Sequence, residues 1–306
     1  MSGSRSGLPP YGPLQSGSEA QPCMAGRALP SPTQCILTQG VLPLPAHWVS
    51  APRADLTADP AGDPSAHSAA ESAGCLATTS TATSTIHSCL LQLREDVPFD
   101  IGQFKAAGMA IPETIARSVP KRQAEFFHGR WAARCVLHQA QDTTGGPDWN
   151  LPIGKSREPL WPAGMVGSLT HCEGFAAAAV ARVSALRALG IDIERVATGD
   201  NLEALRTTTL DAAERRLLES HDNTLPVPVL ITLAFSAKES LFKAAFPSVQ
   251  RYFDFDAARV VELAPSERRL VLQLTERLSP DLQPGSRITA HYALLQPAVV
   301  FTHVSW

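Results

Sequence analysis

The stretch LGIDIERV, residues 189–196, alternates apolar and acidic side chains. Successive side chains of a β-strand point to opposite faces of a sheet, so Ile191 and Ile193 would face a core while Asp192 and Glu194 share the other face. Two carboxylates at this spacing can hold one hard cation such as Mg²⁺, which prefers oxygen ligands. The same pattern fits an ordinary half-exposed strand with two solvated acids. Taken alone, the pentapeptide 190–194 favours that simpler interpretation.

The segment FSAKESLFK, residues 235–243, predicts a helix that holds two lysines close together. The whole chain has five lysines beside 21 arginines, and Lys238 and Lys243 are two of the five. A lysine ammonium is a compact, point-like phosphate donor, and Glu239 shares a helix face with Lys243. A structural interpretation is equally open, because Ser236 and Glu239 fit a capping box and Glu239 and Lys243 fit an i,i+4 ion pair.

Basic side chains form a third group, upstream of these motifs. Beyond Pro120, apolar residues recur at helical spacing, and the same predicted helix carries Arg122, Arg130 and Arg134 on roughly one side. Guanidinium groups match phosphate oxygens in shape and charge, which makes the arginines candidates for phosphate binding. Arginines on the solvated face of a helix are also common.

The loop after this helix is rich in Gly and Pro and adds Lys155 and Arg157, and His171 follows in the segment GSLTHCEGF, residues 167–175. The tripeptide GKS around Lys155 looks like the end of a P-loop. That motif requires Gly where Trp149 stands, so the loop is not a nucleotide-binding P-loop. A single histidine such as His171 is more often a packed or capping residue than a ligand contact.

The remaining pattern predicts an α+β domain of about 220 residues, because helices are interspersed with antiparallel strands. We predict strands in 87–96, 165–168, 174–183 and 189–196, helices in 120–140, 210–221 and 235–246, and antiparallel strands in 251–306.

Composition excludes several functional classes. The 306 residues carry a net charge of −3, which argues against a nucleic-acid binder with a broad basic face. The sequence holds no run of about 18 apolar residues, so we expect no membrane span. The first residues lack the apolar region of a secretory signal, and the six cysteines form no CxxC pair. We therefore expect a cytoplasmic protein.

Residues 1–86 differ from the rest of the chain in amino-acid composition and hydrophobic pattern. They hold 11 of the 25 prolines and no lysine, and they show no regular hydrophobic period. We predict a low-complexity, largely disordered tail, in which two short apolar segments, 35–44 and 46–51, could dock locally. Alternatively, translation begins downstream, for instance at Met24.

Four ordered motifs together resemble one family. They are KRQAEFFHGRWAAR (121–134), REPLWPAGMVGSLTH (157–171), GIDIE (190–194) and LAFSAKESLFKA (233–244). This order is similar to that of the 4′-phosphopantetheinyl transferases of the Sfp-like class, and most of all to the enterobactin synthase component D type. The resemblance covers about residues 87–306, and every motif position that we can match holds the expected residue type.

The resemblance implies a fold and a ligand. The fold would be a pseudo-dimer of two similar α+β halves, 87–188 and 189–306, preceded by the tail 1–86. Coenzyme A would lie in the cleft between the halves.

The resemblance also implies roles for individual residues. Asp192, Glu194 and Glu239 would hold Mg²⁺ against the pyrophosphate of coenzyme A, with Asp192 also lying beside the coenzyme. Lys238 and Lys243 would contact the phosphates, and Lys243 would stabilise or protonate the departing one. Either Glu239 or a water on the metal would take the proton of the acceptor serine.

The nucleotide and its 3′-phosphate would be bound by a basic set: Arg122, Arg130, Thr170 and His171. Lys155 and Arg157 both lie in the loop before the family's WP motif, and the sequence does not decide which of them makes the contact.

By this resemblance the chain would transfer 4′-phosphopantetheine from coenzyme A to a serine of an acyl, peptidyl or aryl carrier protein, and it would act as a monomer. The type that it resembles favours siderophore synthesis of the enterobactin kind, a non-ribosomal peptide pathway. Polyketide and fatty-acid synthesis use the same reaction. Two alternatives remain: a non-catalytic module that binds coenzyme A or a carrier protein, and an ATP-dependent Mg²⁺ phosphotransferase, for which the sequence shows no ATP motif.

Overall fold

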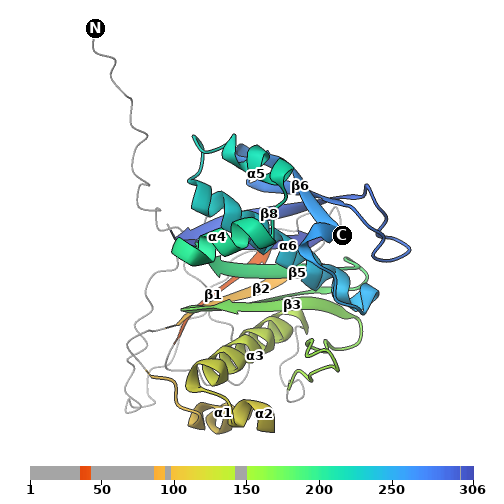
Figure 1. Cartoon of the computed structure of the whole chain (residues 1–306). Helices are drawn as coiled ribbons and strands as arrows, with labels where there is room; N and C mark the ends of the chain where they lie inside the picture. The colour runs from red at the N-terminus through yellow and green to blue at the C-terminus, as the bar shows by residue number, and fades with distance from the viewer. Residues whose placement is uncertain (1–34, 43–85, 94–97, 142–149, 297) are drawn as a thin grey trace, which may run out of the picture.

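The computed structural model describes residues 35–42, 86–93, 98–141, 150–296 and 298–306. Two antiparallel sheets lie against each other, and helices cover the outer face of each (Figure 1). The expected α+β class is confirmed. Within the described ranges, no helix is both long and apolar enough to cross a membrane.

The first sheet has the strand order β1-β2-β4-β3. Its strands are β1 (Cys35–Leu42), β2 (Ile86–Leu93), β3 (Met165–Cys172) and β4 (Phe175–Arg182). Its helices are α1 (Gly102–Ala106), α2 (Glu113–Ala116) and α3 (Pro120–Gln141). The alanine run of β4 is buried on both faces, so that α3 packs on one side and the second sheet on the other.

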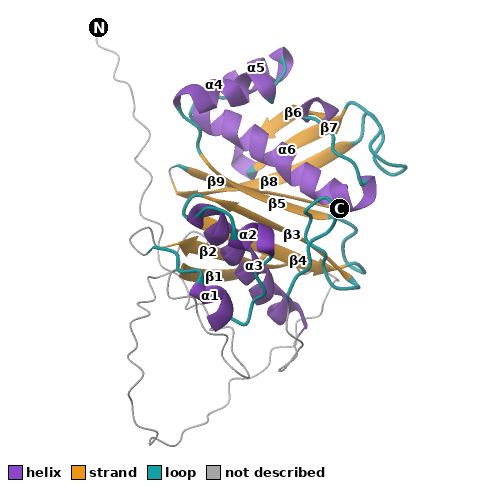
Figure 2. Ribbon diagram, turned by 60° about the horizontal axis from the view of Figure 1, so that its bottom comes forward, coloured by secondary structure: helices purple, strands orange, loops and turns teal. Residues whose placement is uncertain are grey.

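The second sheet has the strand order β5-β9-β8-β7-β6. Its strands are β5 (Leu189–Arg195), β6 (Ala258–Ala264), β7 (Arg269–Leu274), β8 (Arg287–Gln296) and β9 (Val299–Ser305). Its helices are α4 (Gly199–Thr208), α5 (Ala212–Glu219) and α6 (Val227–Val249), with short 3-10 turns at Phe255–Ala257 and Pro265–Glu267. Figure 2 shows α6 running across this sheet, with α4 and α5 beyond one of its ends.

The predicted alternation in β5 is confirmed. Ile191 and Ile193 belong to the apolar layer between the two sheets, which also contains Phe175 and Phe301. Asp192 lies on the opposite face, but that face is covered by α6 rather than by solvent, and Asp192 is only 3% exposed. The interpretation as two solvated acids is therefore wrong for Asp192, whereas Glu194 is half-buried.

Gly190 allows α6 to lie directly on β5. A Cβ atom at this position would stand 1.9 Å from the carbonyl oxygen of Ser240 and 2.6 Å from the amide nitrogen of Ala244. Only a glycine permits so close an approach, because any side chain would collide with the helix backbone. This contact brings the acidic side of β5 next to the polar residues of α6.

One expectation holds for a short segment, and another needs correction. Cys35–Leu42, within the segment 35–44 that was expected to dock locally, form β1 and pair antiparallel with β2, since the outer edge of β2 offers backbone groups that an apolar segment can satisfy. Apart from Ile86, which begins β2, the rest of the predicted tail lies outside the described residues. The capping box at Ser236 is wrong, because α6 begins at Val227 and the Ser236 hydroxyl lies 2.8 Å from Thr302 Oγ1.

Candidate active site

The two sheets meet along their edge strands β3 and β5, and hydroxyl groups of β3 bind the backbone of β5. Ile191 N–H donates to Ser168 Oγ (3.0 Å), and Ile193 N–H donates to Thr170 Oγ1 (3.3 Å). These bonds satisfy donors at the edge of β5 that have no neighbouring strand on that side. They also fix β3 and β5 relative to each other, so residues from both halves converge at one place.

Thr170, Asp192 and Lys243 form the polar centre of this junction. Thr170 Oγ1 donates to Asp192 Oδ1 at 3.0 Å, and Lys243 Nζ donates to the same carboxylate oxygen at 2.5 Å and to Thr170 Oγ1 at 3.2 Å. The i,i+4 ion pair expected between Glu239 and Lys243 is replaced by this contact. The three residues come from β3, β5 and α6, so tertiary structure alone assembles the group.

Carboxylates surround this centre. Burial and the neighbouring carboxylates of Asp192 and Glu239 raise the pKa of Glu194 to about 8, although the Lys243 ammonium opposes the shift. Burial also raises the pKa of Glu239, again with Asp192 adding to the effect and Lys243 opposing it. Mutual repulsion of this kind favours a bound cation, because a cation stabilises all of the charged forms together.

The donor set fits a hard cation. Asp192 Oδ2 is buried and has no hydrogen-bond partner among the described residues, which leaves one carboxylate oxygen available. Carboxylate oxygens are the ligands that Mg²⁺ prefers, and Mg²⁺ needs only one or two of them when substrate phosphates supply the rest. Within the described ranges, no group of three or more acidic, His or Cys side chains is already arranged around a metal position. The observed geometry thus offers Asp192 first, with Glu194 and Glu239 beside it.

A second polar group joins α3 to β3. Arg122 Nη1 lies 3.2 Å from His171 Nε2 and 3.2 Å from Glu125 Oε2. Burial lowers the pKa of His171, with Arg122 and Lys243 adding to the effect while Glu125 and Asp192 oppose it. His171 is therefore neutral near pH 7 and can accept a hydrogen bond from Arg122. The structure brings these two predicted residues together.

Arg130 lies further along α3 and is 9% exposed. Its guanidinium carbon stands 5.1 Å from the centre of the Phe126 ring, and burial lowers its pKa to about 10. Its Nη1 atom is buried without a hydrogen-bond partner in the described part of the chain. A buried guanidinium nitrogen without an acceptor is costly, so Arg130 has the character of a group that awaits an anion.

A cavity of about 390 Å³ opens between the halves beside Lys243. The loop 156–161 and β3 line one side, and Phe242, Phe246 and Tyr252 line the other. Arg157 contributes to this wall, and Lys155 does not. Of the two candidates that the sequence left open, Arg157 is therefore the one at the cavity.

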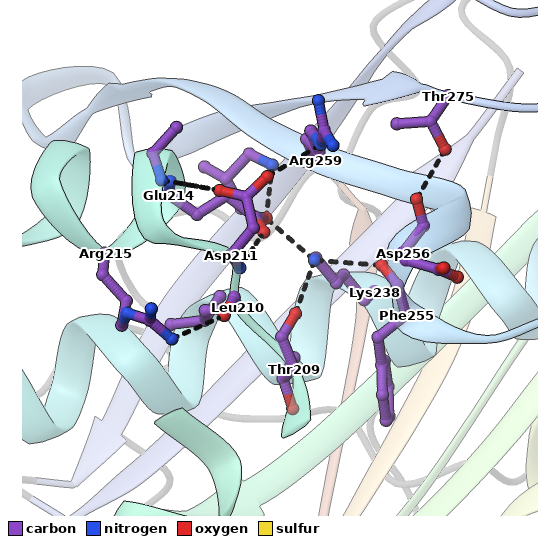
Figure 3. Close-up of polar contacts among 12 residues, drawn as sticks. Thr209, Leu210, Asp211, Glu214, Arg215, Lys238, Phe255, Asp256, Arg259 and Thr275 are labelled. Carbon is purple, nitrogen blue, oxygen red and sulfur yellow. Dashed lines mark hydrogen bonds and ion pairs between the residues drawn. The ribbon is translucent and has the colours of Figure 1, made fainter. Parts of the chain in front are cut away.

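Lys238 lies away from this centre. Its side chain is 3% exposed, and its ammonium forms an ion pair with Glu214 at 2.8 Å (Figure 3). The expectation that Lys238 contacts phosphates finds no support in this geometry. Consecutive residues of a helix point about 100° apart, so the Lys238 ammonium can pair with Glu214 while the Glu239 carboxylate lies near Asp192 and Lys243.

Sequence reasoning missed two residues at the site. Glu125 lies against both Arg122 and His171, and only its i,i+3 spacing from Arg122 signals this contact. Tyr252 Oη donates to the carbonyl oxygen of Ser156 across the cavity at 3.2 Å. The sequence YFDF at 252–255 signals an aromatic cluster but not its partner in the other half.

The fold and the site together define an α+β protein of two halves, with acidic and basic side chains gathered where the halves meet. Comparison with known protein families also divides the chain into two parts. Residues 111–181 match the 4′-phosphopantetheinyl transferase N-terminal domain, and residues 188–292 match the 4′-phosphopantetheinyl transferase superfamily. The two matches fall on the first and second sheets respectively.

Individual relatives support the same assignment. The chain is 37% identical to enterobactin synthase component D of Salmonella typhimurium over 180 residues, which is 58% of this chain and 71% of that protein. It is 38% identical to 4′-phosphopantetheinyl transferase Npt of Nocardia iowensis over 150 residues, 48% of this chain and 62% of the relative. It is 39% identical to 4′-phosphopantetheinyl transferase PptT of Mycobacterium tuberculosis over 149 residues, 48% of this chain and 61% of the relative.

The chain belongs to the 4′-phosphopantetheinyl transferase superfamily. The matches to the Nocardia and Mycobacterium proteins span somewhat less than two thirds of those relatives' lengths.

Proposed function

We propose that this chain transfers the 4′-phosphopantetheine group of coenzyme A to a serine hydroxyl of an apo carrier protein and releases adenosine 3′,5′-bisphosphate. The observation that carries the proposal is a pair of buried, unsatisfied atoms of opposite charge. Arg130 Nη1 and Asp192 Oδ2 both lack a partner among the residues described. A phosphate ester bound together with a cation would satisfy both, and membership of the family indicates coenzyme A.

The cavity between the halves suits the nucleotide end of that substrate. It combines apolar walls with Arg157 and Lys243 at its edge, as a binding site for a base and its phosphates requires. Thr170 of β3 contacts Lys243 at the cavity, and the next residue, His171, contacts Arg122 of α3. We assign the 3′-phosphate to the arginines of α3 and the pyrophosphate to the end where Lys243 and Asp192 meet.

The carboxylates would hold Mg²⁺ at that end, with Asp192 as the first ligand and Glu194 and Glu239 beside it. Bound there, Mg²⁺ would neutralise charge on the pyrophosphate and lower the energy of the transition state. Lys243 would contribute a second positive charge directly next to Asp192. Positioning and charge stabilisation are the main requirements of phosphoryl-type transfer.

The transfer itself balances without a further reactant. The serine oxygen forms a bond to the β-phosphorus, the bond from that phosphorus to the bridging oxygen breaks, and adenosine 3′,5′-bisphosphate leaves with the electron pair. We propose that the serine proton is accepted either by Glu239, whose pKa is raised by burial above that of an exposed glutamate, or by a water on the cation. Lys243 would stabilise the departing phosphate.

The carrier is proposed from the relatives alone. Several of the relatives are named enterobactin synthase component D. We therefore propose carrier domains of siderophore-type peptide synthesis first. Carrier proteins of polyketide and fatty-acid synthesis are the next candidates. The two halves, 87–188 and 189–306, are proposed to act as one catalytic unit.

Intact-mass spectrometry tests the proposal. A panel of purified apo carrier proteins is incubated with the chain, coenzyme A and Mg²⁺, and each carrier is weighed. We expect the mass increment of phosphopantetheine on at least one carrier and on none whose acceptor serine is replaced by alanine. Tight binding of coenzyme A without an increment on any carrier would instead favour the non-catalytic module.

A further inference from the structure

Lys238 and Glu214 form a buried ion pair between α6 and α5 (Figure 3). Besides the contact with Glu214 Oε1 at 2.8 Å, Lys238 Nζ donates to the carbonyl oxygens of Thr209 (2.7 Å) and Phe255 (3.1 Å). An ammonium group has three hydrogens, so these three acceptors use its full donor capacity. Lys238 therefore has no hydrogen left for a phosphate in this arrangement.

Glu214 extends the network on the other side. Its Oε1 atom accepts from Val260 N–H at 2.8 Å, and its Oε2 atom accepts from Asp211 N–H at 2.8 Å. Asp211 in turn caps α5 and pairs with Arg259 at 2.8 Å. One ion pair thus connects the end of α4, the start of α5, the middle of α6, the turn at Phe255 and strand β6.

This network borders a second cavity, of about 290 Å³, which shares Phe242 and Tyr252 with the lining of the first one. Lys238 and Glu239 line it from α6, and residues 252–255 line it from the opposite side. The bond from Lys238 to Phe255 links these two walls directly. At the other end of the same wall, Tyr252 reaches the first half of the chain through Ser156.

A buried ion pair between Lys238 and Glu214 is not explained by stability alone. A buried ion pair is often no more stabilising than well-packed apolar residues of the same volume, whereas its hydrogen bonds demand one particular arrangement. The arrangement demanded here is the distance between the helix turn that carries Glu239 and the wall 252–255.

We propose that Lys238 is a positioning residue that acts with Glu214 to set the wall opposite Glu239, without touching coenzyme A. The inference rests on the proposed function and refines it, because it replaces the phosphate contact that the resemblance implied for Lys238. The proposal therefore predicts that replacing Glu214, which lies on α5, lowers turnover as much as replacing Lys238 does.

The test compares Lys238→Met, Glu214→Gln and the double variant with the unchanged chain. For each we would measure kcat and KM for coenzyme A in carrier modification, and the affinity for adenosine 3′,5′-bisphosphate by calorimetry. We expect both single variants to lose about tenfold or more in kcat, because small displacements at a reacting centre have effects of this size. Nucleotide affinity should stay within about twofold, and the double variant should be no slower than either single one.

Arg259→Met provides the matched control, since it breaks the exposed ion pair with Asp211 in the same network and should keep the original kcat. A loss in Lys238→Met combined with full activity in Glu214→Gln would overturn the inference and restore a direct phosphate contact.

The single variants each leave one buried charge unpaired, which is strongly destabilising. If they do not fold, the double variant decides, because it removes both charges. Reduced kcat with retained nucleotide affinity supports the inference, and unchanged kcat contradicts it. An unchanged chain that modifies no carrier contradicts the proposed function and the inference with it, whereas active variants contradict the inference alone.

Discussion

Arg130, which we propose as a phosphate ligand, shows how a binding role would conflict with stability at a single residue. Its guanidinium is buried against Phe126 with one nitrogen unsatisfied in the described structure, and burial depresses its pKa to about 10. Such a group destabilises the fold unless a ligand satisfies it. Natural proteins accept this kind of local penalty mainly at binding sites.

Arg130→Met should therefore separate the two effects. We expect equal or higher thermal stability, because the variant removes an uncompensated buried charge and keeps an apolar side chain of similar length. The KM for coenzyme A should rise by about tenfold or more, since charge-assisted contacts to phosphate are among the strong hydrogen bonds. Dephospho-coenzyme A, which lacks the 3′-phosphate, should be used equally well by the variant and the original chain. A variant with unchanged KM for coenzyme A would refute the assignment of Arg130.

At the scale of elements, the packing of α6 on β5 builds the site. Gly190 removes the side chain that would separate them, and Asp192 and Lys243 then meet at 2.5 Å. The hydroxyl groups of Ser168 and Thr170 fix β3 on the other side of β5. The proposed catalytic arrangement thus depends on backbone distances as much as on the candidate side chains.

Gly190→Ala tests this dependence. The added methyl group would overlap the backbone of α6, so we expect a loss of about 1–3 kcal/mol in the free energy of unfolding and a large loss of transfer activity. Urea denaturation and the carrier-modification assay measure the two effects. Gly129→Ala is the control, because its Cβ would meet only Leu169 Cδ1 at 3.6 Å, and alanine stabilises a helix by about 1 kcal/mol over glycine. Equal behaviour of the two variants would contradict the argument.

Local sequence patterns were sufficient to predict some helices and strands but not others. The alternation around Asp192 and the helical spacing beyond Pro120 predicted β5 and α3, because both signals lie within the segment itself. The start of α6 and the surroundings of Lys238 were not predictable in this way. Ser236 mimics a helix cap locally, and the partner of Lys238 is Glu214, 24 residues away in the sequence.

The candidate site was predictable as a set of residues only through the resemblance of ordered motifs. The composition of the motifs indicates a metal and phosphates, but it does not say which charges are satisfied inside the protein. Lys155 and Arg157 are two residues apart, and only the shape of the loop places Arg157 at the cavity.

At the scale of the whole molecule, two sheets enclose one apolar layer, and the site lies at the edge of that layer. His303 of β9 pairs in register with Ile191, which belongs to the layer, and stacks on His291 with ring centres 5.2 Å apart. Burial, with a smaller effect of His291, lowers the pKa of His303 to about 4. The folded protein thus holds His303 neutral at a pH where the unfolded chain would protonate it.

This difference predicts acid sensitivity. A histidine with a lowered pKa contributes stability that is present above pH 6.5 and is lost as the pH falls towards 4, because the unfolded chain binds the proton first. We expect His303 to account for a loss of about 2 kcal/mol in the free energy of unfolding between pH 7 and pH 5. The variant His303→Leu should lose less over the same interval by about that amount. Parallel pH profiles in urea denaturation would show that His303 is not responsible.

We propose that carboxylates at the junction between the sheets hold a divalent cation for transfer from coenzyme A. This is tested by the rate of holo-carrier formation by metal-depleted protein as Mg²⁺ is added back, for the original chain and for Asp192→Asn. We expect a saturable dependence on Mg²⁺ in the original chain and a rate at least about 100-fold lower in Asp192→Asn at every Mg²⁺ concentration. Transfer that proceeds without Mg²⁺, or an Asp192→Asn variant with the original rate and Mg²⁺ dependence, would contradict it.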